Sequence, residues 1–392
     1  MTTTIPPTDK ALPRSLWALM MGNFVIGTGV MVVPGTLNDI STSLNVSIPQ
    51  AGQLITAAAI LMGLGAPAFA TLVAGWDRRR LLTLSLVWYA LLTGICALAP
   101  NYATLLPLRV LAVIAPAVFT PQAAASVGLL VSPAQRGRAI TFVFLGWSVA
   151  SVMGMPLSAW IGGTLGWRWA FGLVAAMSVV SAAWVWREMP NGIRPAALSR
   201  QAWGQTLGSA PLMLAVGVTL LSAFGQFTLF SYFAPYFFQT LGLGGAALSL
   251  MFLWFGAFGL AGNVGLSRWI DRIGAPRAVL LTLGAMVLTL LLWPLGQAGI
   301  WQQALVLVPW ALGCFACNSA QQARLVHLSP VLAPATVALN TSAMYGGQAL
   351  GAALGGLLIA QGHMLRLHQV GLVVLIFAMA LSVWAARAQK RS

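Results

Sequence analysis

Long runs of apolar residues, separated by short polar breaks, follow one another along the whole chain. A membrane-spanning helix needs about 20 consecutive, mostly apolar residues. The runs are continuous and do not alternate between apolar and polar positions, as the strands of a membrane β-barrel do. The pattern therefore predicts an all-α membrane protein with twelve transmembrane helices. The expected spans are 15–37, 50–74, 81–99, 104–130, 139–162, 168–187, 209–237, 246–266, 278–296, 303–325, 336–359 and 369–387.

Charges and turn-forming residues mark the breaks between these spans, for example at 77–80, 133–138 and 268–277. The longest polar stretch, 188–208, falls near the middle of the chain and predicts a cytoplasmic linker between two six-helix halves. The expected division is a cytoplasmic N-terminal tail at 1–14, a six-helix bundle at 15–187, the linker at 188–208, a second six-helix bundle at 209–387 and a cytoplasmic C-terminal tail at 388–392.

The composition agrees with a membrane protein. Hydrophobic residues make up 59% of the 392 positions, charged residues only 6%, and the mean hydropathy is +0.87. Soluble proteins carry roughly a quarter charged residues. So few charges exclude a water-soluble body of this length.

The basic residues predict the orientation of the chain. A net charge of +15 would suggest a nucleic-acid partner if it formed one face of a soluble module. With a cytoplasmic N-terminus, however, 17 of the 20 Lys and Arg residues fall in inside segments, and the three others are Arg109, Arg168 and Arg366. This positive-inside bias predicts a multi-pass protein of the cell (inner) membrane with both termini cytoplasmic and no nucleic-acid partner. Contact of the inside charges with anionic lipid is a further reading.

Few residues in the chain have the chemistry that enzymes use. Neither Lys10 nor Lys390 stands in a P-loop motif, and Glu188, the one glutamate, has no flanking histidines for a zinc site. Cys314 and Cys317 have C-x-x-C spacing but lie inside an expected span, without a second pair. We therefore expect no catalytic residue, no metal site and no cofactor.

The two halves of the sequence repeat each other. Asp77 and Asp271 stand in similar loops, at a separation of 271 − 77 = 194 residues. Gly163 and Gly356 end similar glycine-rich spans, at a separation of 356 − 163 = 193 residues. The separations indicate a duplicated six-helix unit. Parallel halves of this kind are typical of secondary transporters whose substrate site lies between the halves, near the membrane midplane.

Several motifs resemble the major facilitator superfamily. Residues 271–277 (D-R-I-G-A-P-R) resemble the family's loop signature, and 77–80 (D-R-R-R) is a shortened copy without the glycine. Arg109 resembles the arginine of the family's fourth-helix motif, and the glycines and proline within 146–163 resemble the fifth-helix antiporter motif. The chain is similar to this superfamily over essentially its whole length, and most of all to its drug:proton antiporters and arabinose (sugar) efflux permeases. The resemblance implies the major facilitator fold, with two pseudo-symmetric halves.

The resemblance also implies roles for the loop motifs. In the family, the loop cluster at the cytoplasmic face latches the outward-facing state. The residues that carry this gating role by resemblance are Asp77, Arg78, Arg79, Asp271, Arg272 and Arg277. The alternative is that they only anchor the chain at the membrane surface.

Small residues in the fifth span suggest a conformational hinge. The candidates are Gly146, Gly154, Pro156 and Gly163. Glycine allows helices to approach closely and proline bends a helix. Ordinary small-residue packing is the alternative explanation.

Arg109 is the most distinctive single residue, since it lies about six residues inside the fourth span. A charged side chain there costs ~2.5–3.5 kcal/mol on insertion scales, so it suggests a functional site. Snorkelling of the side chain to the outer interface is the alternative.

The expected acidic partner of this arginine is missing. Many drug:proton antiporters carry an acid in the first helix after a Gly-Thr pair, but here Gly29 follows Gly27 and Thr28. The acid nearest to a cavity is Asp39, which is the candidate proton site. Three hypotheses remain open: Asp39 pairs with Arg109 and titrates, Arg109 holds an anionic substrate, or the protein is an uncoupled facilitator.

By analogy with the family, spans one, four, seven and ten line the cavity, with span eleven beside them. Polar and aromatic residues on these spans are the candidates for substrate contact. Asn340, Met344 and Gln348 share one helix face, which favours a wet cavity. Hydrogen bonds between helices are the alternative, worth ~0.6 kcal/mol each. The substrate-binding candidates are Asn23, Arg109, Gln122, Gln226, Tyr232, Tyr236, Asn318, Gln322, Asn340, Tyr345 and Gln348.

These observations favour a monomeric secondary active transporter, not an enzyme. We expect it to export a small organic molecule (a drug-like compound, sugar or nucleoside) by alternating access, coupled to protons. An uncoupled facilitator, or an importer of an organic anion, is the alternative. A membrane-embedded enzyme would need a convergent catalytic constellation that the sequence lacks. A sensor or scaffold on this fold would be expected to carry a large soluble appendage.

Overall fold

The computed structural model describes residues 13–73, 75–132, 135–194, 200–329 and 332–389. These residues form the helices α1 to α16 and one short 3₁₀ helix, and none of them is in a β-strand. Twelve helical segments are long and apolar enough to cross a membrane. The prediction of an all-α protein with twelve spans is confirmed.

The first half of the chain contains eight helices. They are α1 (Arg14–Gly35), α2 (Leu37–Leu44), α3 (Ile48–Leu72), α4 (Arg78–Ala97), α5 (Tyr102–Ala112), α6 (Ile114–Leu130), α7 (Arg136–Leu165) and α8 (Trp167–Glu188). The second half begins with α9, which lies inside the stretch predicted as a linker. Its helices are α9 (Arg200–Gly208), α10 (Ala210–Phe230), α11 (Phe233–Leu241), α12 (Gly245–Ile273), α13 (Ala275–Gly296), α14 (Ile300–Leu328), α15 (Ala333–Ala360), η2 (Met364–Arg366) and α16 (Leu367–Gln389).

Two of the predicted spans are interrupted helices. One consists of α5 and α6, and the other consists of α10 and α11. Proline explains both breaks, because it has no N–H to donate to the carbonyl four residues earlier. Pro116 leaves the carbonyl of Ala112 without this bond, and Pro235 does the same for Ser231. Each helix therefore ends where its proline removes a rung of the hydrogen-bond ladder.

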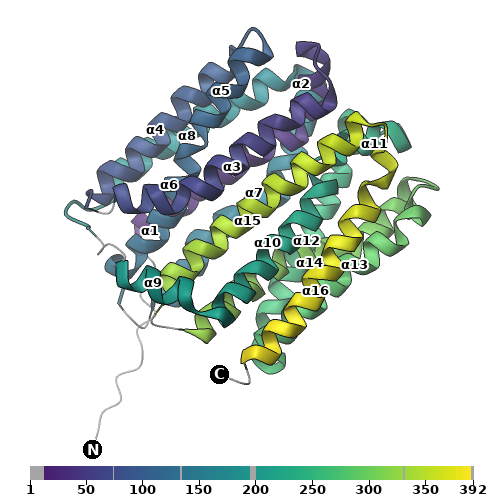
Figure 1. The fold of residues 1–392 in the computed structure, drawn as a ribbon. Helices are drawn as coiled ribbons and strands as arrows, with labels where there is room; N and C mark the ends of the chain where they lie inside the picture. The colour runs from purple at the N-terminus through teal and green to yellow at the C-terminus, as the bar shows by residue number, and fades with distance from the viewer. Residues whose placement is uncertain (1–12, 74, 133–134, 195–199, 330–331, 390–392) are drawn as a thin grey trace, which may run out of the picture.

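The helices form two groups that lie side by side (Figure 1). Contacts between the groups run mainly along α3 with α15 and along α7 with α12. The start of α1 and the end of α16 lie at the same end of the bundle, which we call the basal end; α2 and α11 lie at the opposite, apical end. The described contacts between the halves that involve α2 and α11 are therefore apical.

Equivalent glycines show the duplication in three dimensions. A side chain added at Gly146 of α7 would overlap the carbonyl of Met20 on α1, and one added at Gly347 of α15 would overlap the carbonyl of Leu220 on α10. The separations are 347 − 146 = 201 and 220 − 20 = 200 residues. The two halves thus repeat the same close helix crossing, which confirms the pseudo-symmetric fold.

The equivalent glycines are 201 residues apart in the sequence, whereas the repeated sequence motifs are 193 and 194 residues apart. With the separation of 201 residues between Gly146 and Gly347, the counterpart of Gly163 is residue 163 + 201 = 364, so Gly163 and Gly356 are not equivalent. Glycine recurs at several positions along both spans, so a sequence match can select the wrong pair.

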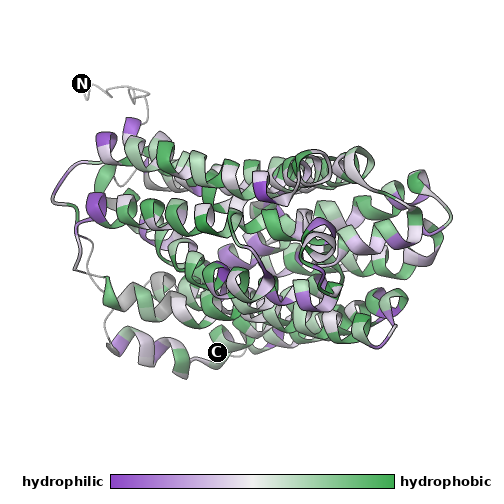
Figure 2. Ribbon diagram, turned by 90° about the horizontal axis from the view of Figure 1, so that it is seen from above, coloured by the Kyte–Doolittle hydropathy of each residue, from purple (hydrophilic) through white to green (hydrophobic). Residues whose placement is uncertain are grey.

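The outer surface of the bundle is apolar. Large hydrophobic side chains stay exposed on it, among them Leu64, Leu98 and Trp301. Figure 2 shows hydrophobic residues along the lengths of the helices and hydrophilic residues gathered at helix ends and loops. An exposed apolar surface of this extent is stable only against lipid. The protein is therefore a multi-pass membrane protein.

Candidate functional site

Arg109 is buried on α5, with 3% of its surface exposed. Its Nη2 donates a hydrogen bond of 3.0 Å to the carbonyl oxygen of Gly29 on α1. Its Cζ lies 6.0 Å from the ring centre of Phe171. Its Nε and Nη1 are buried without a hydrogen-bond partner. The guanidinium thus keeps donors available inside the bundle.

The structure explains the glycine at position 29, where the resemblance led us to expect an acid. A Cβ at position 29 would overlap the hydroxyl of Tyr89 and would lie 2.8 Å from Val174. The Tyr89 hydroxyl lies beside the Arg109 guanidinium. Tyrosine therefore occupies the space of an acidic side chain, and the backbone carbonyl of Gly29 takes its place as the acceptor.

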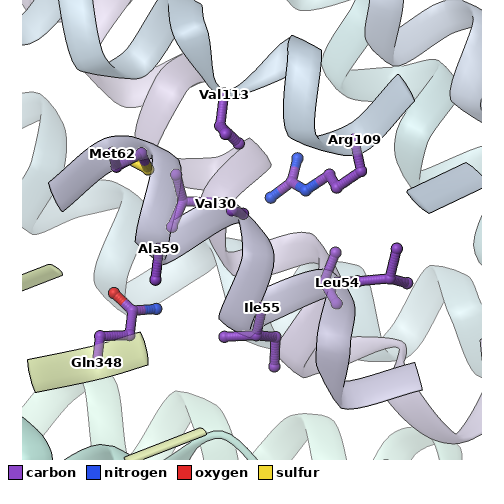
Figure 3. Close-up of a pocket in the computed structure, with 10 residues that line it drawn as sticks. Val30, Leu54, Ile55, Ala59, Met62, Arg109, Val113 and Gln348 are labelled. Atoms are coloured by element: carbon purple, nitrogen blue, oxygen red, sulfur yellow. The ribbon is translucent and has the colours of Figure 1, made fainter. Parts of the chain in front are cut away.

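A small pocket opens beside Arg109. Most of its wall is apolar and comes from the first half, including Val30, Ile55 and Met62. Gln348 of α15 contributes an amide from the second half. In Figure 3 the guanidinium of Arg109 and the amide of Gln348 approach the pocket from opposite sides. The pocket thus joins both halves at one charged and one polar group.

Tyr345 also crosses from the second half into the first. It is buried among Met62 of α3, Val113 between α5 and α6, and Ala117 of α6. Nearby, a Cβ on Gly63 would lie 3.2 Å from the backbone nitrogen of Gly346. The absence of a side chain on Gly63 therefore lets α15 press against α3 at the level of the pocket.

Asn23 belongs to a second polar group, within the first half. Its amide nitrogen donates to the carbonyl of Val143 at 3.1 Å, and its side-chain oxygen accepts from the hydroxyl of Thr120 at 2.8 Å. The indole N–H of Trp147 donates to the same hydroxyl at 3.2 Å. This group ties α1, α6 and α7 together, as the interhelical hydrogen-bond alternative predicts for Asn23.

Asn340 belongs to a third polar group, within the second half. Its side-chain oxygen accepts from the hydroxyl of Thr219 at 2.5 Å, and its amide donates to Asn318 at 3.5 Å. Gln321 donates to the same hydroxyl at 3.1 Å. The group joins α10, α14 and α15. Asn318 is half-buried, so one edge of the group remains accessible.

The other predicted contact residues are scattered. Gln122 is buried, and Gln226 and Gln322 are half-buried. Tyr236 is fixed in an aromatic cluster, where its hydroxyl accepts from Trp293 and from Gln297, each at 2.9 Å. The structure does not bring Tyr236 to the pocket.

Tyr232 closes the apical side between the halves. Its hydroxyl donates to the carbonyl of Ala352 at 2.6 Å. The same hydroxyl lies where a Cβ of Gly52 on α3 would be, and 2.8 Å from the Cβ position of Gly356 on α15. Glycine on both helices therefore makes room for one tyrosine across the interface.

The predicted hinge residues also lie at helix contacts. Gly154 packs against the backbone of Thr28, and Gly163 lies opposite the backbone of Gly245. The carbonyl of Pro156 accepts a hydrogen bond of 2.8 Å from the hydroxyl of Ser249 on α12. Helix α7 is thus held closely to α1 on one side and to α12 on the other.

Asp39 lies in α2, at the apical end. It is half-buried and contacts the position of a Cβ on Gly162. Burial raises the pKa of Asp39 above its ordinary value, and a hydrogen bond within the residue opposes this shift. The acceptor of Arg109 is Gly29, and Asp39 makes no ion pair with Arg109. The first of the three hypotheses requires Asp39 to pair with Arg109, and this pairing is absent from this conformation.

Asp77 links the loop before α4 to the segment after α8. It caps α4 by accepting from the backbone N–H of Arg80 at 3.2 Å, and it accepts from the N–H of Gly192 at 2.6 Å. The backbone N–H of Arg78 donates to the carbonyl of Ile193 at 2.9 Å. In this conformation the described bonds of Asp77 stay within the first half and the start of the linker.

The remaining gating candidates differ in their surroundings. Arg78 is buried and donates to two carbonyls of its own loop, while Arg79 stacks over the ring of Trp186 at 4.3 Å. Arg272 and Arg277 are exposed. Asp271 lies in α12, and its side chain is outside the described part of the structure.

One basic residue predicted near the inside surface is buried instead. Arg324 donates from Nη1 to the hydroxyl of Ser382 at 3.1 Å, which ties α14 to α16. Cys314 and Cys317 are buried free thiols. Within the described residues, no group of His, Cys, Asp and Glu is arranged to hold a metal ion.

Sequence reasoning missed Tyr89, Thr120, Thr219 and Gln321. Each is a polar residue inside an apolar span, which is a usable signal. Their importance depends on partners more than 80 residues away for Thr120, Thr219 and Gln321. Sequence alone did not show these partners.

The Major Facilitator Superfamily profile matches residues 19–337 of the chain. The chain belongs to this superfamily. This confirms the predicted family and identifies the protein as a small-molecule transporter, not an enzyme. The pocket beside Arg109 therefore lies between the two halves of a major facilitator fold.

Relatives in the superfamily include export proteins. The chloramphenicol resistance protein of Streptomyces lividans is 31% identical over 86% of this chain and 88% of its own length. A probable sugar efflux transporter of Pasteurella multocida is 24% identical over 93% of this chain and 90% of its own. The predicted resemblance to drug and sugar effluxers is therefore confirmed.

A solved structure shows the same fold. A bacterial homolog of the human lysosomal transporter Spinster, in an inward-facing and unoccupied conformation, superposes with a TM-score of 0.72. The match covers 97% of this chain and 99% of that chain at 18% identity. At this identity the similarity demonstrates the shared architecture.

Proposed function

We propose that this transporter exports a small organic molecule by alternating access between its two halves. The observation that supports this most is the pocket in which Arg109 of the first half meets Gln348 of the second. A site shared by two rigid halves changes its exposure when the halves rock against each other. Export is supported by the resistance and efflux names of the relatives, since a transporter that protects against a drug must remove it from the cell.

The closed apical side supports an inward-facing conformation. Tyr232 with Gly52, Ser249 with Pro156, and α2 with α11 connect the halves at or near the apical end. The positive-inside bias makes the basal end cytoplasmic. Helix α1 begins and α16 ends at the basal end, so we propose that both termini are cytoplasmic. We infer a location in the inner membrane and a monomeric protein.

The predicted gating and contact residues take their places in this proposal. Asp77, its arginines and the equivalent cluster that begins at the end of α12 would rearrange when the basal side closes. The polar group around Asn23 joins α1, α6 and α7, and the group around Asn340 joins α10, α14 and α15, so both include helices that cross closely within one half. They would adjust their hydrogen bonds as the cavity opens and closes.

The energy source has two candidates. Proton coupling would use Asp39, the candidate proton site, because burial raises its pKa above the ordinary value of an aspartate. Uncoupled movement of an anion is favoured by the unpartnered donors of Arg109.

Flux measurements in proteoliposomes test the proposal. The purified protein is presented with labelled chloramphenicol, arabinose and a nucleoside, with and without a pH gradient. We expect saturable flux of at least one compound above protein-free vesicles, and a loss of this flux in Arg109→Ala. The absence of specific flux, together with no effect of Arg109→Ala, would show that the proposed function is wrong.

A further inference from the structure

Arg109 is a buried charge that the protein leaves incompletely compensated. Its described polar neighbours are neutral, namely the carbonyl of Gly29 and the hydroxyl of Tyr89, and its Nε and Nη1 complete no hydrogen bond. A buried charged group without partners is strongly unfavourable. An arginine fork matches a planar acid group with two parallel hydrogen bonds. The site therefore has the donors, and lacks the anion, of a complete ion pair.

The described acids of the chain do not supply this anion. Asp39 lies in α2 without an ion pair to Arg109, and Asp77 caps α4. Glu188 lies at the end of α8, 4.0 Å from Arg187. An acid at position 29 has no space, because Tyr89 occupies it. The anion that completes the site must therefore come from outside the described chain.

The residues that line the small pocket beside Arg109 indicate the chemistry of the rest of the ligand. Its wall is formed by aliphatic side chains such as Val30, Ile55 and Met62, with the amide of Gln348 opposite the guanidinium. One guanidinium and one amide suit a single compact acid group. A phosphate with two charges would need more donors than the pocket provides. The aliphatic wall suits an apolar body.

We propose that the transported substrate is a small amphipathic organic monoanion whose acid group binds Arg109, and that its export is driven by the membrane potential. The proposal rests on the proposed export function. The positive charge of Arg109 belongs to the protein and is neutralised only in the loaded state. Each cycle then moves one net negative charge outward, which the negative interior of a cell favours. This removes the need for a membrane-embedded carboxylate.

A binding experiment tests the ligand class without transport. Thermal unfolding of the purified full chain in detergent is measured with p-toluenesulfonate, with its neutral isostere p-toluenesulfonamide and with inorganic sulfate. We expect a saturable rise in the unfolding temperature with the sulfonate alone. Arg109→Gln should weaken its apparent affinity at least tenfold. Equal effects of sulfonate and sulfonamide on the unmodified protein would overturn the proposal, whether or not the variant folds.

The control variant carries another arginine change at the apical end. Arg168 of α8 donates to Ser43 and to the carbonyl of Ala99, away from the pocket. Arg168→Gln should leave the affinity for p-toluenesulfonate unchanged. If both variants weaken binding equally, the effect is general destabilisation and the assignment to Arg109 is wrong.

A flux experiment tests the driving force. Proteoliposomes with equal pH on both sides receive valinomycin and a tenfold K⁺ gradient of either direction. Labelled p-toluenesulfonate should accumulate up to tenfold in the positive compartment, reverse with the gradient and be insensitive to a protonophore. Flux that ignores the potential would overturn the electrogenic step. Binding of the sulfonate without any flux would reject the proposed export function and keep the ligand class. Flux of neutral compounds without sulfonate binding would reject the ligand class and keep the export function.

Discussion

The Nη2 of Arg109 donates a hydrogen bond of 3.0 Å to the backbone carbonyl of Gly29, at the position where the resemblance predicts a carboxylate. A carbonyl orients the guanidinium but leaves its charge in place. The hydroxyl of Tyr89 stands in the space of the missing side chain. Position 29 thus determines both the geometry and the electrostatics of the site.

The contact between Gly29 and Tyr89 predicts a stability effect. Gly29→Ala should lower the free energy of unfolding by about 1–3 kcal/mol, because overpacking a close contact forces neighbouring atoms to move. Tyr89→Ala in the same chain should recover part of the loss. Denaturant titration in detergent measures both values. Gly172→Ala on α8 is the control, since no atom lies within 4 Å of its Cβ position; an equal loss there would contradict the prediction.

The contact between Tyr232 and Gly52 predicts a shift in conformation. Gly52→Ala places a methyl group on the Tyr232 hydroxyl, so it should open the apical side. A single cysteine introduced beside Tyr232 should then react faster with a membrane-impermeant maleimide added from the apical side. Gly284→Ala on α13 has open space at its Cβ position and should not change this rate. An unchanged rate in Gly52→Ala would argue against an apical gate at this position.

The bonds of Asp77 predict that the start of the linker depends on this carboxylate. Asp77→Ala removes the cap of α4 and the acceptor of the Gly192 N–H. It should cost about 0.5–2 kcal/mol for the cap and should speed proteolysis within 188–194. Asn101→Ala removes only the cap of α5, where Asn101 accepts from Thr104 at 3.0 Å. Asn101→Ala should therefore cause a similar loss of stability without speeding proteolysis within 188–194. Equal cleavage in both variants would contradict the role of Asp77 in holding the start of the linker.

The raised pKa of Asp39 predicts a pH-dependent stability. Because its pKa is higher in the folded than in the unfolded state, the ionised side chain destabilises the fold above the folded-state pKa. Asp39→Asn should therefore be more stable than the unmodified protein at neutral pH. The difference should shrink as the pH falls through that pKa towards the unfolded value of about 3.9. Unfolding temperatures across this pH range give the measurement, with Glu188→Gln as the control.

The same variant decides whether Asp39 carries protons. If it does, Asp39→Asn should abolish the response of export to a pH gradient while substrate binding persists. Undiminished proton-driven export would exclude Asp39 as the proton site.

Local composition was enough to predict the membrane architecture. Burying a backbone in lipid requires helices of about 20 apolar residues, so the twelve spans could be read from local composition and agree with the structure. The sequence also showed Gly29, Arg109 and the two aspartate loops as unusual residues. The proline breaks near Ala112 and Ser231 had a signal in the sequence that the apolar pattern concealed.

The contacts of these residues follow from the packing of the helices and could not be predicted. Asp39 does not reach Arg109, Tyr236 is fixed within an aromatic cluster, and Gln348 arrives at the pocket from the other half. The helices in contact are far apart in the chain. They approach each other at glycines, and the sequence does not show which of the many glycines in each span make these contacts. Hydrophobicity places each helix in the membrane, because transfer into lipid depends on the composition of each segment. The choice of neighbours depends on shape, which only the packed helices define.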